Sequence, residues 1–286
     1  MPETVPVVLS IAGFDPSSGA GVTADIKTAA AHGCYGVACI TAVTVQSTTG
    51  VQRVVASDPA VVSDTLAVLA ADVELAGIHI GMLGSDGVVR AVVRFLETTR
   101  PKAQNVVLDP VLRSSSGAEL LEGPGVRSLR DKLMPICDVI TPNTAEAAML
   151  TGVEISDEED MRSAACRLHE LGAAATVITG GEMQQAVDLL SFQTRRGVEQ
   201  EVFRGSKLVS NSTHGTGCAF SMAMACHLAL GRGLAEATLL AKVYVSAAIA
   251  AAYPLGRGHG PVNHLYRMGE IKRTSQTTGE NEKPGE

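Results

Sequence analysis

Short apolar runs alternate with longer stretches of helical spacing along most of the chain, which is typical of strands connected by helices. The apolar runs that predict strands are VPVVLSIAG (Val5–Gly13), GVACITAVTVQS (Gly36–Ser47), GIHIGMLG (Gly77–Gly84), NVVLDPV (Asn105–Val111) and AATVITGG (Ala174–Gly181). The stretches that predict helices are Gly19–Gly33, Asp58–Val73, a segment ending near Thr99, and the later part of Asp138–Gly152, which follows a further short strand and a turn. This order predicts an α/β fold of three layers, a mostly parallel sheet with helices on both faces.

The last third of the chain departs from this alternation. AVDLLSF and EQEVFRG flank a turn at Arg195–Gly197 and predict an antiparallel hairpin. Two long alanine-rich helices follow, and the polar segment from about Met268 predicts a disordered tail. We expect one domain over residues 1–267 with no separate lid, because no insertion is long enough to form one.

Composition narrows the class of protein further. The 286 residues carry a net charge of -7, and aromatic residues make up only 3%. The negative charge argues against nucleic acid or an anionic membrane as partner. The six cysteines show no metal-binding spacing, and together with the absence of a signal-peptide pattern they predict a cytoplasmic protein with reduced thiols.

In a parallel sheet, ligands bind beyond the carboxyl ends of the strands. The residues that the pattern places at those ends are Gly13, Gln46, Met82, Asp109, Asn143, Thr179 and Gly180. Several of them are polar, and an acid such as Asp109 after an apolar strand is costly unless it faces a cleft or a partner. A Gln amide such as that of Gln46 can pair with a ring nitrogen beside an exocyclic amine, although an exposed strand-end Gln needs no such role.

The stretch NSTHGTGCAFSMAMA places Gly215, Thr216 and Gly217 directly before Cys218 at the start of a predicted helix. The free amides and dipole of a helix N-terminus bind anions, and glycines let a ligand approach the backbone. The same position stabilises a thiolate, so we expect the pKa of Cys218 to be lowered. The alternative is an ordinary capped loop with a cysteine in the core.

Taken together, SIAGFDPSSGAGVTADIKT, AVTVQST, DPV, TPNTAEA, STHGTGCAFSMA and GHGPVNH resemble the hydroxymethylpyrimidine/phosphomethylpyrimidine kinases of thiamine biosynthesis, in the ribokinase-like superfamily. The resemblance covers about Val5 to Leu265. It implies ATP-dependent phosphorylation of 4-amino-5-hydroxymethyl-2-methylpyrimidine and then of its monophosphate. It also implies a homodimer.

The resemblance assigns roles to the candidate residues. Cys218 would take the proton of the substrate hydroxymethyl group, while the amides of the turn from Gly215 to Cys218 hold the charge on the transferred phosphoryl group. Gln46 would pair with the aminopyrimidine. The residues that would line the same pocket are Gly13, Asp25, Met82 and Val111, with Asp25 near the amine.

On the nucleotide side, Asn143 and Glu146 match the N-x-x-E motif of the superfamily, which acts on Mg2+ bound to the phosphates of ATP. With Asp109 they would hold Mg2+ mostly through water. The same pattern also predicts a helix cap. Thr179 and Gly180 would lie beside ATP.

The chain departs from the family pattern after the strand Ala174–Gly181. The family reads Lys-Gly-Gly-His there, and this chain has Thr179 in place of the lysine and Glu182 in place of the histidine. Lys242 and Arg113 are candidates to supply the missing positive charge. A Cys–His catalytic pair between Cys218 and His214 is disfavoured, because neighbouring turn residues point apart.

Two other functions fit parts of the sequence. A pyridoxal or pyridoxine kinase would share the scaffold and a cysteine at the same position, but pyridoxal lacks the nitrogen and amine pair that suits Gln46. A non-catalytic pyrimidine-binding regulator would explain Thr179, whereas the intact turn at Cys218 argues against it.

Overall fold

The structure is a computed structural model that describes residues 5–99, 105–114, 117–181, 183, 186–208 and 210–268. The predicted polar tail beyond Met268 and the position of Glu182 lie outside the described residues. Within the described part, no helix is both long enough and apolar enough to cross a membrane.

The strands and helices alternate through the first two thirds of the chain, as the pattern predicts. The strands are β1 (Val7–Phe14), β2 (Tyr35–Ser47), β3 (Gly50–Ala56), β4 (Leu75–Ile80), β5 (Val106–Leu108), β6 (Val139–Ile140), β7 (Ala175–Gly180), β8 (Ala186–Thr194) and β9 (Gly197–Gly205). The α-helices are α1 (Gly21–Ala31), α2 (Pro59–Asp72), α3 (Asp86–Thr99), α4 (Gly123–Ser128), α5 (Thr144–Thr151), α6 (Glu158–Glu170), α7 (Thr216–Ala229) and α8 (Leu234–Ala250). Short π- and 3-10 turns cover Leu129–Leu133, Met134–Ile136 and Tyr266–Met268.

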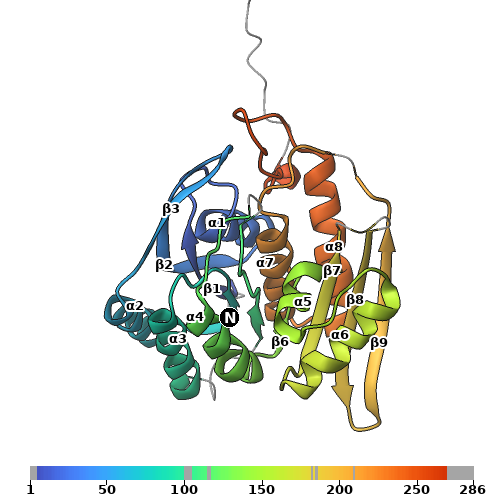
Figure 1. Ribbon diagram of the computed structural model, residues 1–286. Helices are drawn as coiled ribbons and strands as arrows, with labels where there is room; N and C mark the ends of the chain where they lie inside the picture. The colour runs from blue at the N-terminus through green and yellow to red at the C-terminus, as the bar shows by residue number, and fades with distance from the viewer. Residues whose placement is uncertain are drawn as a thin grey trace, which may run out of the picture.

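The nine strands of the described residues form one sheet in the order β3-β2-β1-β4-β5-β6-β7-β8-β9. The six strands from β2 to β7 in that order are parallel, and β3, β8 and β9 add antiparallel pairings at the two edges. Figure 1 shows the β2–β3 hairpin at one edge and the β8–β9 hairpin at the opposite edge. The mostly parallel sheet and the hairpin at the end of the sheet are therefore confirmed.

Side chains alternate between two apolar layers, because successive residues of a strand point to opposite faces. Leu9, Ile78 and Leu108 pack with the residues of α2, α3 and α6 on one face. Val8 and Val107 pack with α7 and α8 on the other. The three-layer arrangement follows from this double burial of the central strands.

The strand β3 is missing from the prediction. Gly50–Ala56 pairs antiparallel with β2, Val43 opposite Val55 and Thr44 opposite Val54. Most of its side chains are half-buried or exposed, so the segment lacks the apolar run that marks the central strands. A hairpin held mainly by backbone pairing to one neighbour leaves little trace in the hydrophobic pattern.

Candidate active site

The strand order places a topological switch point, where a binding crevice is expected, at the carboxyl ends of β1 and β4. From β1 the chain goes to β2 on one side and later returns to β4 on the other. Helix α1, which follows β1, packs with α7 on one face of the sheet, whereas helix α3, which follows β4, packs on the other face. This is the arrangement that opens a binding crevice in α/β sheets. Gly13 lies at the end of β1 and Met82 follows β4, so both line this point.

Two glycine turns meet in the crevice and bring the first turns of α1 and α7 together. Gly21 begins α1 with a φ of 59°, and a Cβ there would lie 2.1 Å from the carbonyl oxygen of Gly13. Gly215 caps α7 with a φ of 81°, and a Cβ there would lie 1.8 Å from the carbonyl oxygen of Gly19. Only glycine fits either position. Two helix N-termini, each with free amides and a positive dipole end, therefore face the same space.

Cys218 lies in the first turn of α7 and is half-buried. Its pKa is raised well above 9.0, because burial and the nearby carboxylates of Asp109 and Asp25 outweigh a hydrogen bond that the backbone N–H of Gly21 donates to the sulfur. The expectation of a lowered pKa is wrong for the unliganded protein. Helix N-termini stabilise a thiolate, but here the surrounding negative charge is the larger effect.

The carboxylates belong to a buried chain of charged groups behind the turn. Asp25 and His79 are both fully buried, with His79 Nδ1 3.0 Å from Asp25 Oδ2, and the Ser10 hydroxyl donates to the same oxygen at 2.6 Å. Burial alone would lower the pKa of His79, but the carboxylates of Asp25 and Asp109 raise it. Ser10 and His79 are thus polar residues of apolar strands, and their side chains lie on the face of the sheet that carries α1 and α7.

Asp109 stands at the end of β5 on the face that carries α7. A Cβ on Gly217 would lie 3.5 Å from its Oδ2, so this carboxylate borders the amides of the glycine turn. Burial and the nearby carboxylate of Asp25 raise the pKa of Asp109 to about 7, against the attraction of His79 and a hydrogen bond from Ser221. A buried carboxyl with a raised pKa, open toward an anion-binding turn, is a position where a cation would be stabilising.

The structure places Asp25 in a buried layer, and its contact with the substrate amine, which the resemblance implies, stays a prediction. Its side chain is fully buried beneath the turn and is held by Ser10 and His79, although Oδ1 has no hydrogen-bond partner among the described residues. The geometry makes Asp25 the buried partner of His79.

The other candidates for the pyrimidine pocket do come together. A Cβ on Gly13 would lie 3.0 Å from the sulfur of Met82, so that glycine leaves room for the methionine. Met82 and Val111 belong to one small apolar cluster with Ala42 and Leu120. A cluster of this kind at the strand ends can contact the flat face of a heteroaromatic ring.

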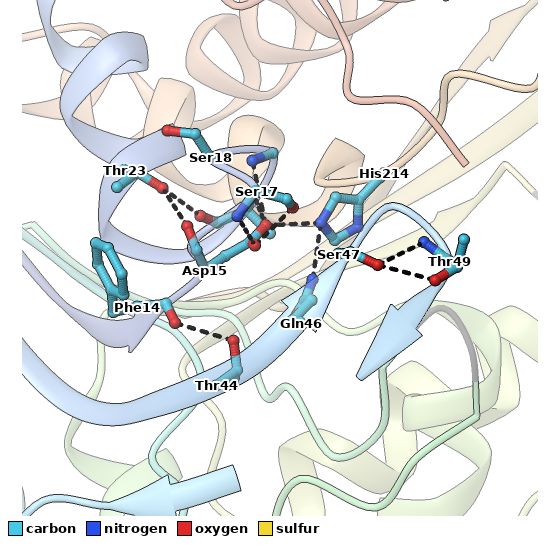
Figure 2. A network of polar contacts seen from close by, with 12 residues as sticks. Phe14, Asp15, Ser17, Ser18, Thr23, Thr44, Gln46, Ser47, Thr49 and His214 are labelled. Atoms are coloured by element: carbon cyan, nitrogen blue, oxygen red, sulfur yellow. Dashed lines mark hydrogen bonds and ion pairs between the residues drawn. The ribbon is translucent and has the colours of Figure 1, made fainter. Parts of the chain in front are cut away.

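Gln46 lies at the end of β2, on the side of the hairpin that faces the glycine turns. Its amide contacts the imidazole of His214, Nε2 to Nε2 at 3.2 Å, and the same ring nitrogen lies 2.8 Å from Asp15 Oδ2 (Figure 2). His214 therefore pairs with Asp15 and Gln46, in agreement with the prediction that it does not form a catalytic pair with Cys218.

Asp15 is a site residue that the sequence interpretation missed. Its carboxylate accepts hydrogen bonds from the backbone of Ser17, Gly19 and Ala20, which shapes the loop before α1 (Figure 2). Burial opposes ionisation, but the bonds from His214 and Ser17 hold the pKa of Asp15 down at about 2. The signal was present in the stretch DPSSG, where an Asp before Pro and small residues is a common turn former.

The nucleotide-side candidates also lie close to one another, around the ends of β6 and β7. Asn143 Oδ1 accepts from the Glu146 N–H at 2.8 Å, and Glu146 Oε2 accepts from the Asn143 N–H at 3.0 Å, so the alternative of a helix cap is confirmed. Asn143 pairs with Thr179 through a single parallel bridge. The N–H of Gly180 donates to Asp188 Oδ1 at 3.1 Å.

Lys242 of α8 reaches the position next to Thr179. Its ammonium lies 2.7 Å from Asp188 Oδ2, and Asp188 stands directly opposite Thr179 in the β7–β8 pairing. Lys242 is 12% exposed and Asp188 8%, so the pair is largely withdrawn from water. Arg113 is exposed in the loop after β5, where its backbone forms an isolated antiparallel β-bridge with that of Glu119. Of the two candidate cations, Lys242 is the one that the fold holds beside the end of β7.

Comparison with known proteins identifies the family of this chain. A family model described as phosphomethylpyrimidine kinase matches residues 15–263. The chain belongs to the phosphomethylpyrimidine kinase family. It is accordingly a kinase with the ribokinase-like fold, and its nucleotide is ATP.

Curated relatives agree with this assignment. The chain is 40% identical over 270 residues to the hydroxymethylpyrimidine/phosphomethylpyrimidine kinase of Streptomyces coelicolor, covering 94% of this chain and 98% of that protein. It is 42% identical over 267 residues to the thiamine biosynthesis bifunctional protein ThiED of Geobacter sulfurreducens, where the match covers 93% of this chain. The chain spans only about half of that bifunctional protein, 53% of its length.

A solved structure of similar fold is the ADP complex of Bacillus subtilis pyridoxal kinase. It matches with a TM-score of 0.83 and 32% identity, covering 93% of this chain and 100% of that chain. The likeness supports the fold and places a nucleotide-binding protein among the neighbours of this chain.

Proposed function

We propose that the protein transfers the γ-phosphoryl group of ATP to the hydroxymethyl group of 4-amino-5-hydroxymethyl-2-methylpyrimidine, and then phosphorylates the resulting monophosphate. One observation carries the proposal: the first turns of α1 and α7 converge on Cys218 and Asp109 at the carboxyl ends of the strands. Amides preorganised around a point where negative charge develops are the main device of phosphoryl transfer.

The turn supplies most of this stabilisation. The N–H groups of Thr216, Gly217 and Cys218 stand at the start of α7, with the macrodipole adding to them. Gly215 keeps the turn sharp enough to let phosphoryl oxygens approach the backbone. Substitution there should lower the rate of transfer more than the affinity for the pyrimidine.

Cys218 is the group we assign to the proton of the substrate alcohol. Its raised pKa keeps the thiol protonated, because burial and the negative charge of Asp109, Asp25 and Glu146 all disfavour the thiolate. Positive charge brought to Asp109 reduces this repulsion, so the thiol becomes a stronger acid when the site fills. The second acceptor is a phosphate oxygen that is already anionic, and that step needs the base less.

The oxygen donors around Asp109 suit a Mg2+ ion held largely through water better than one held directly by three protein ligands. No group of three or more His, Cys, Asp or Glu side chains in the described ranges could hold a metal ion. Asp109 offers a hard oxygen, and the cap residues Asn143 and Glu146 lie beyond it. We propose that they hold Mg2+ largely through water, and the metal would neutralise charge on the phosphates. Lys242, held by Asp188, supplies the charge that a lysine in place of Thr179 would give.

The pyridoxal kinase alternative is favoured by one observation, the likeness to the Bacillus subtilis enzyme. Gln46 favours the aminopyrimidine, because its amide can bond a ring nitrogen and an amine together. A panel of the two alcohols, assayed by ADP release with ATP and Mg2+, separates them. We expect kcat/KM for the aminopyrimidine to exceed that for pyridoxal at least tenfold, and the reverse order would contradict the proposal.

The mechanism is tested with matched cysteine variants of one helix. Cys218→Ala should lower the first phosphorylation more than the second, whereas Cys226→Ala, a buried thiol two turns further along α7, should leave both close to wild type. Both products are followed in one time course. Equal losses in the two steps for Cys218→Ala would remove the base from the mechanism.

We also propose that the protein is a cytoplasmic homodimer. No disulfide joins any of the six cysteines, all of which lie in the described residues, as is usual in a reducing compartment. Val43, Val45 and Val55 form an exposed apolar face on the β2–β3 hairpin, with Val43 directly opposite Val55. A second copy that covers this face would shield an apolar strand edge. Val55→Lys should shift the protein to monomer in light scattering, and an unchanged mass would exclude this face.

A further inference from the structure

His214 connects three parts of the site that are far apart in sequence. Its Nε2 lies 2.8 Å from Asp15 Oδ2, in the loop before α1, and 3.2 Å from the amide of Gln46, at the end of β2 (Figure 2). His214 itself directly precedes the turn at Gly215. Its side chain is 15% exposed, so these contacts are shielded from most solvent.

The partners of Asp15 determine which group donates in the first contact. Oδ1 accepts from the N–H and the hydroxyl of Ser17, at 2.8 and 2.6 Å. Oδ2 accepts from the N–H groups of Gly19 and Ala20, at 3.1 and 2.9 Å. Every one of these groups is a donor, so both oxygens act as acceptors and the carboxyl carries no proton. His214 must therefore donate its Nε2–H to Asp15.

This donor sets the orientation of the Gln46 amide. A Gln amide has nearly the same shape when its oxygen and nitrogen are exchanged, so the hydrogen bonds around it decide which end faces a neighbour. An NH2 group at 3.2 Å from the His214 Nε2–H would place two donors against each other. If the amide oxygen of Gln46 faces the imidazole instead, the Nε2–H of His214 is shared between this oxygen and Asp15. The NH2 group of Gln46 is then left for a ligand.

We propose that His214 is a positioning residue that fixes the polarity of the Gln46 amide and so makes the site select a ring nitrogen acceptor beside an amine donor. This inference rests on the proposed aminopyrimidine substrate. The NH2 of Gln46 donates to the ring nitrogen. Its oxygen has a second lone pair, which accepts from the amine while the first accepts from His214.

The consequence is discrimination against the oxo counterpart of the same ring. A 4-oxo pyrimidine presents a ring N–H donor beside a carbonyl acceptor, the opposite pattern, and it would bind only to an amide turned end for end. While His214 donates, that turn costs a hydrogen bond and creates a donor clash. Without the donor, the amide is free to match either ring.

The test compares the dissociation constants of the amino alcohol and of its 4-oxo counterpart by calorimetry, in wild type, His214→Leu and His214→Gln. Bidentate pairs of this kind discriminate by about 1–3 kcal/mol, so we expect the ratio of the two constants to fall about tenfold or more in His214→Leu. His214→Gln keeps an N–H donor of similar reach and should retain most of the ratio. A ratio unchanged in His214→Leu, with both ligands weakened equally, would overturn the proposal.

A second measurement needs no variant and no turnover. Long-range proton–nitrogen spectra of wild type with labelled histidine report which ring nitrogen of His214 carries hydrogen. Protonated Nε2 is the expected result, and an unprotonated Nε2 in the folded protein would overturn the proposal. Failure of the proposed function looks different: neither ring binds or is phosphorylated, although the Nε2–H of His214 is present.

Discussion

Replacing Asp15 by asparagine tests how much of the stability of the site depends on one buried carboxylate. Asp15 accepts five hydrogen bonds, including that of His214, and its pKa is held at about 2. The drop from 3.8 to about 2 corresponds to an upper limit of about 2.5 kcal/mol, at roughly 1.4 kcal/mol per pKa unit. We expect Asp15→Asn to lower the free energy of unfolding by about 2 kcal/mol at pH 7.

The sign of the pH dependence follows from the lowered pKa. A carboxyl with a pKa below that of the unfolded chain stabilises the fold fully above about pH 4, and this contribution is lost as the pH falls toward 2. Urea denaturation of wild type and variant at pH 7 and pH 3 measures it. The difference between the two proteins should therefore shrink at pH 3.

The matched control is Asp58→Asn. Asp58 caps α2 through one bond to the Ala60 N–H in an exposed position, and asparagine caps helices about as well as aspartate. Its loss at pH 7 should stay below about 0.5 kcal/mol. The reasoning fails if Asp15→Asn loses no more than Asp58→Asn, or if its deficit is the same at both pH values.

The remaining predictions concern the charged groups around the transferred phosphoryl group. Asp109→Asn should reduce kcat at least 100-fold, yet stabilise the unliganded protein at pH 8, because the pKa of Asp109 is raised to about 7 and its ionisation opposes folding; urea denaturation should show this gain disappearing near pH 4. Lys242→Met should raise KM for ATP several-fold with a smaller effect on KM for the pyrimidine, measured by varying each substrate in turn. Thr179→Lys in the Lys242→Met background should restore part of the ATP affinity. If the affinity does not recover, a lysine at position 179 does not replace the charge of Lys242.

The central strands were predictable because burial on both faces leaves an almost unbroken apolar run. Val7–Phe14 and Ala175–Gly180 are of this kind, and the sequence pattern located both to within two residues at each end. The strand Gly50–Ala56 has no such run, because it pairs with one neighbour and leaves side chains in solvent. Pairing of backbone groups across a tight turn is invisible to a search for periodicity.

In the candidate site, too, the sequence pattern picks out some features and not others. Glycines, Cys218 and the strand-end residues were found because they sit at fixed points of the topology. The electrostatic surroundings were not, since the pKa of Cys218 depends on Asp25 and Asp109, whose approach is a property of packing. His79 illustrates what could have been noticed: a histidine inside the apolar stretch GIHIG needs a buried partner, and Asp25 provides it.

The contact between Gly19 and Gly215 joins regions almost 200 positions apart, and it has a consequence for biosynthesis. Because the carbonyl of Gly19 lies where a Cβ of residue 215 would be, the turn that we propose binds the phosphoryl group is complete only when both regions are in place. During synthesis the region around Gly19 therefore leaves the ribosome well before its partner at Gly215, and the proposed phosphoryl-binding turn cannot close against it until both have been made.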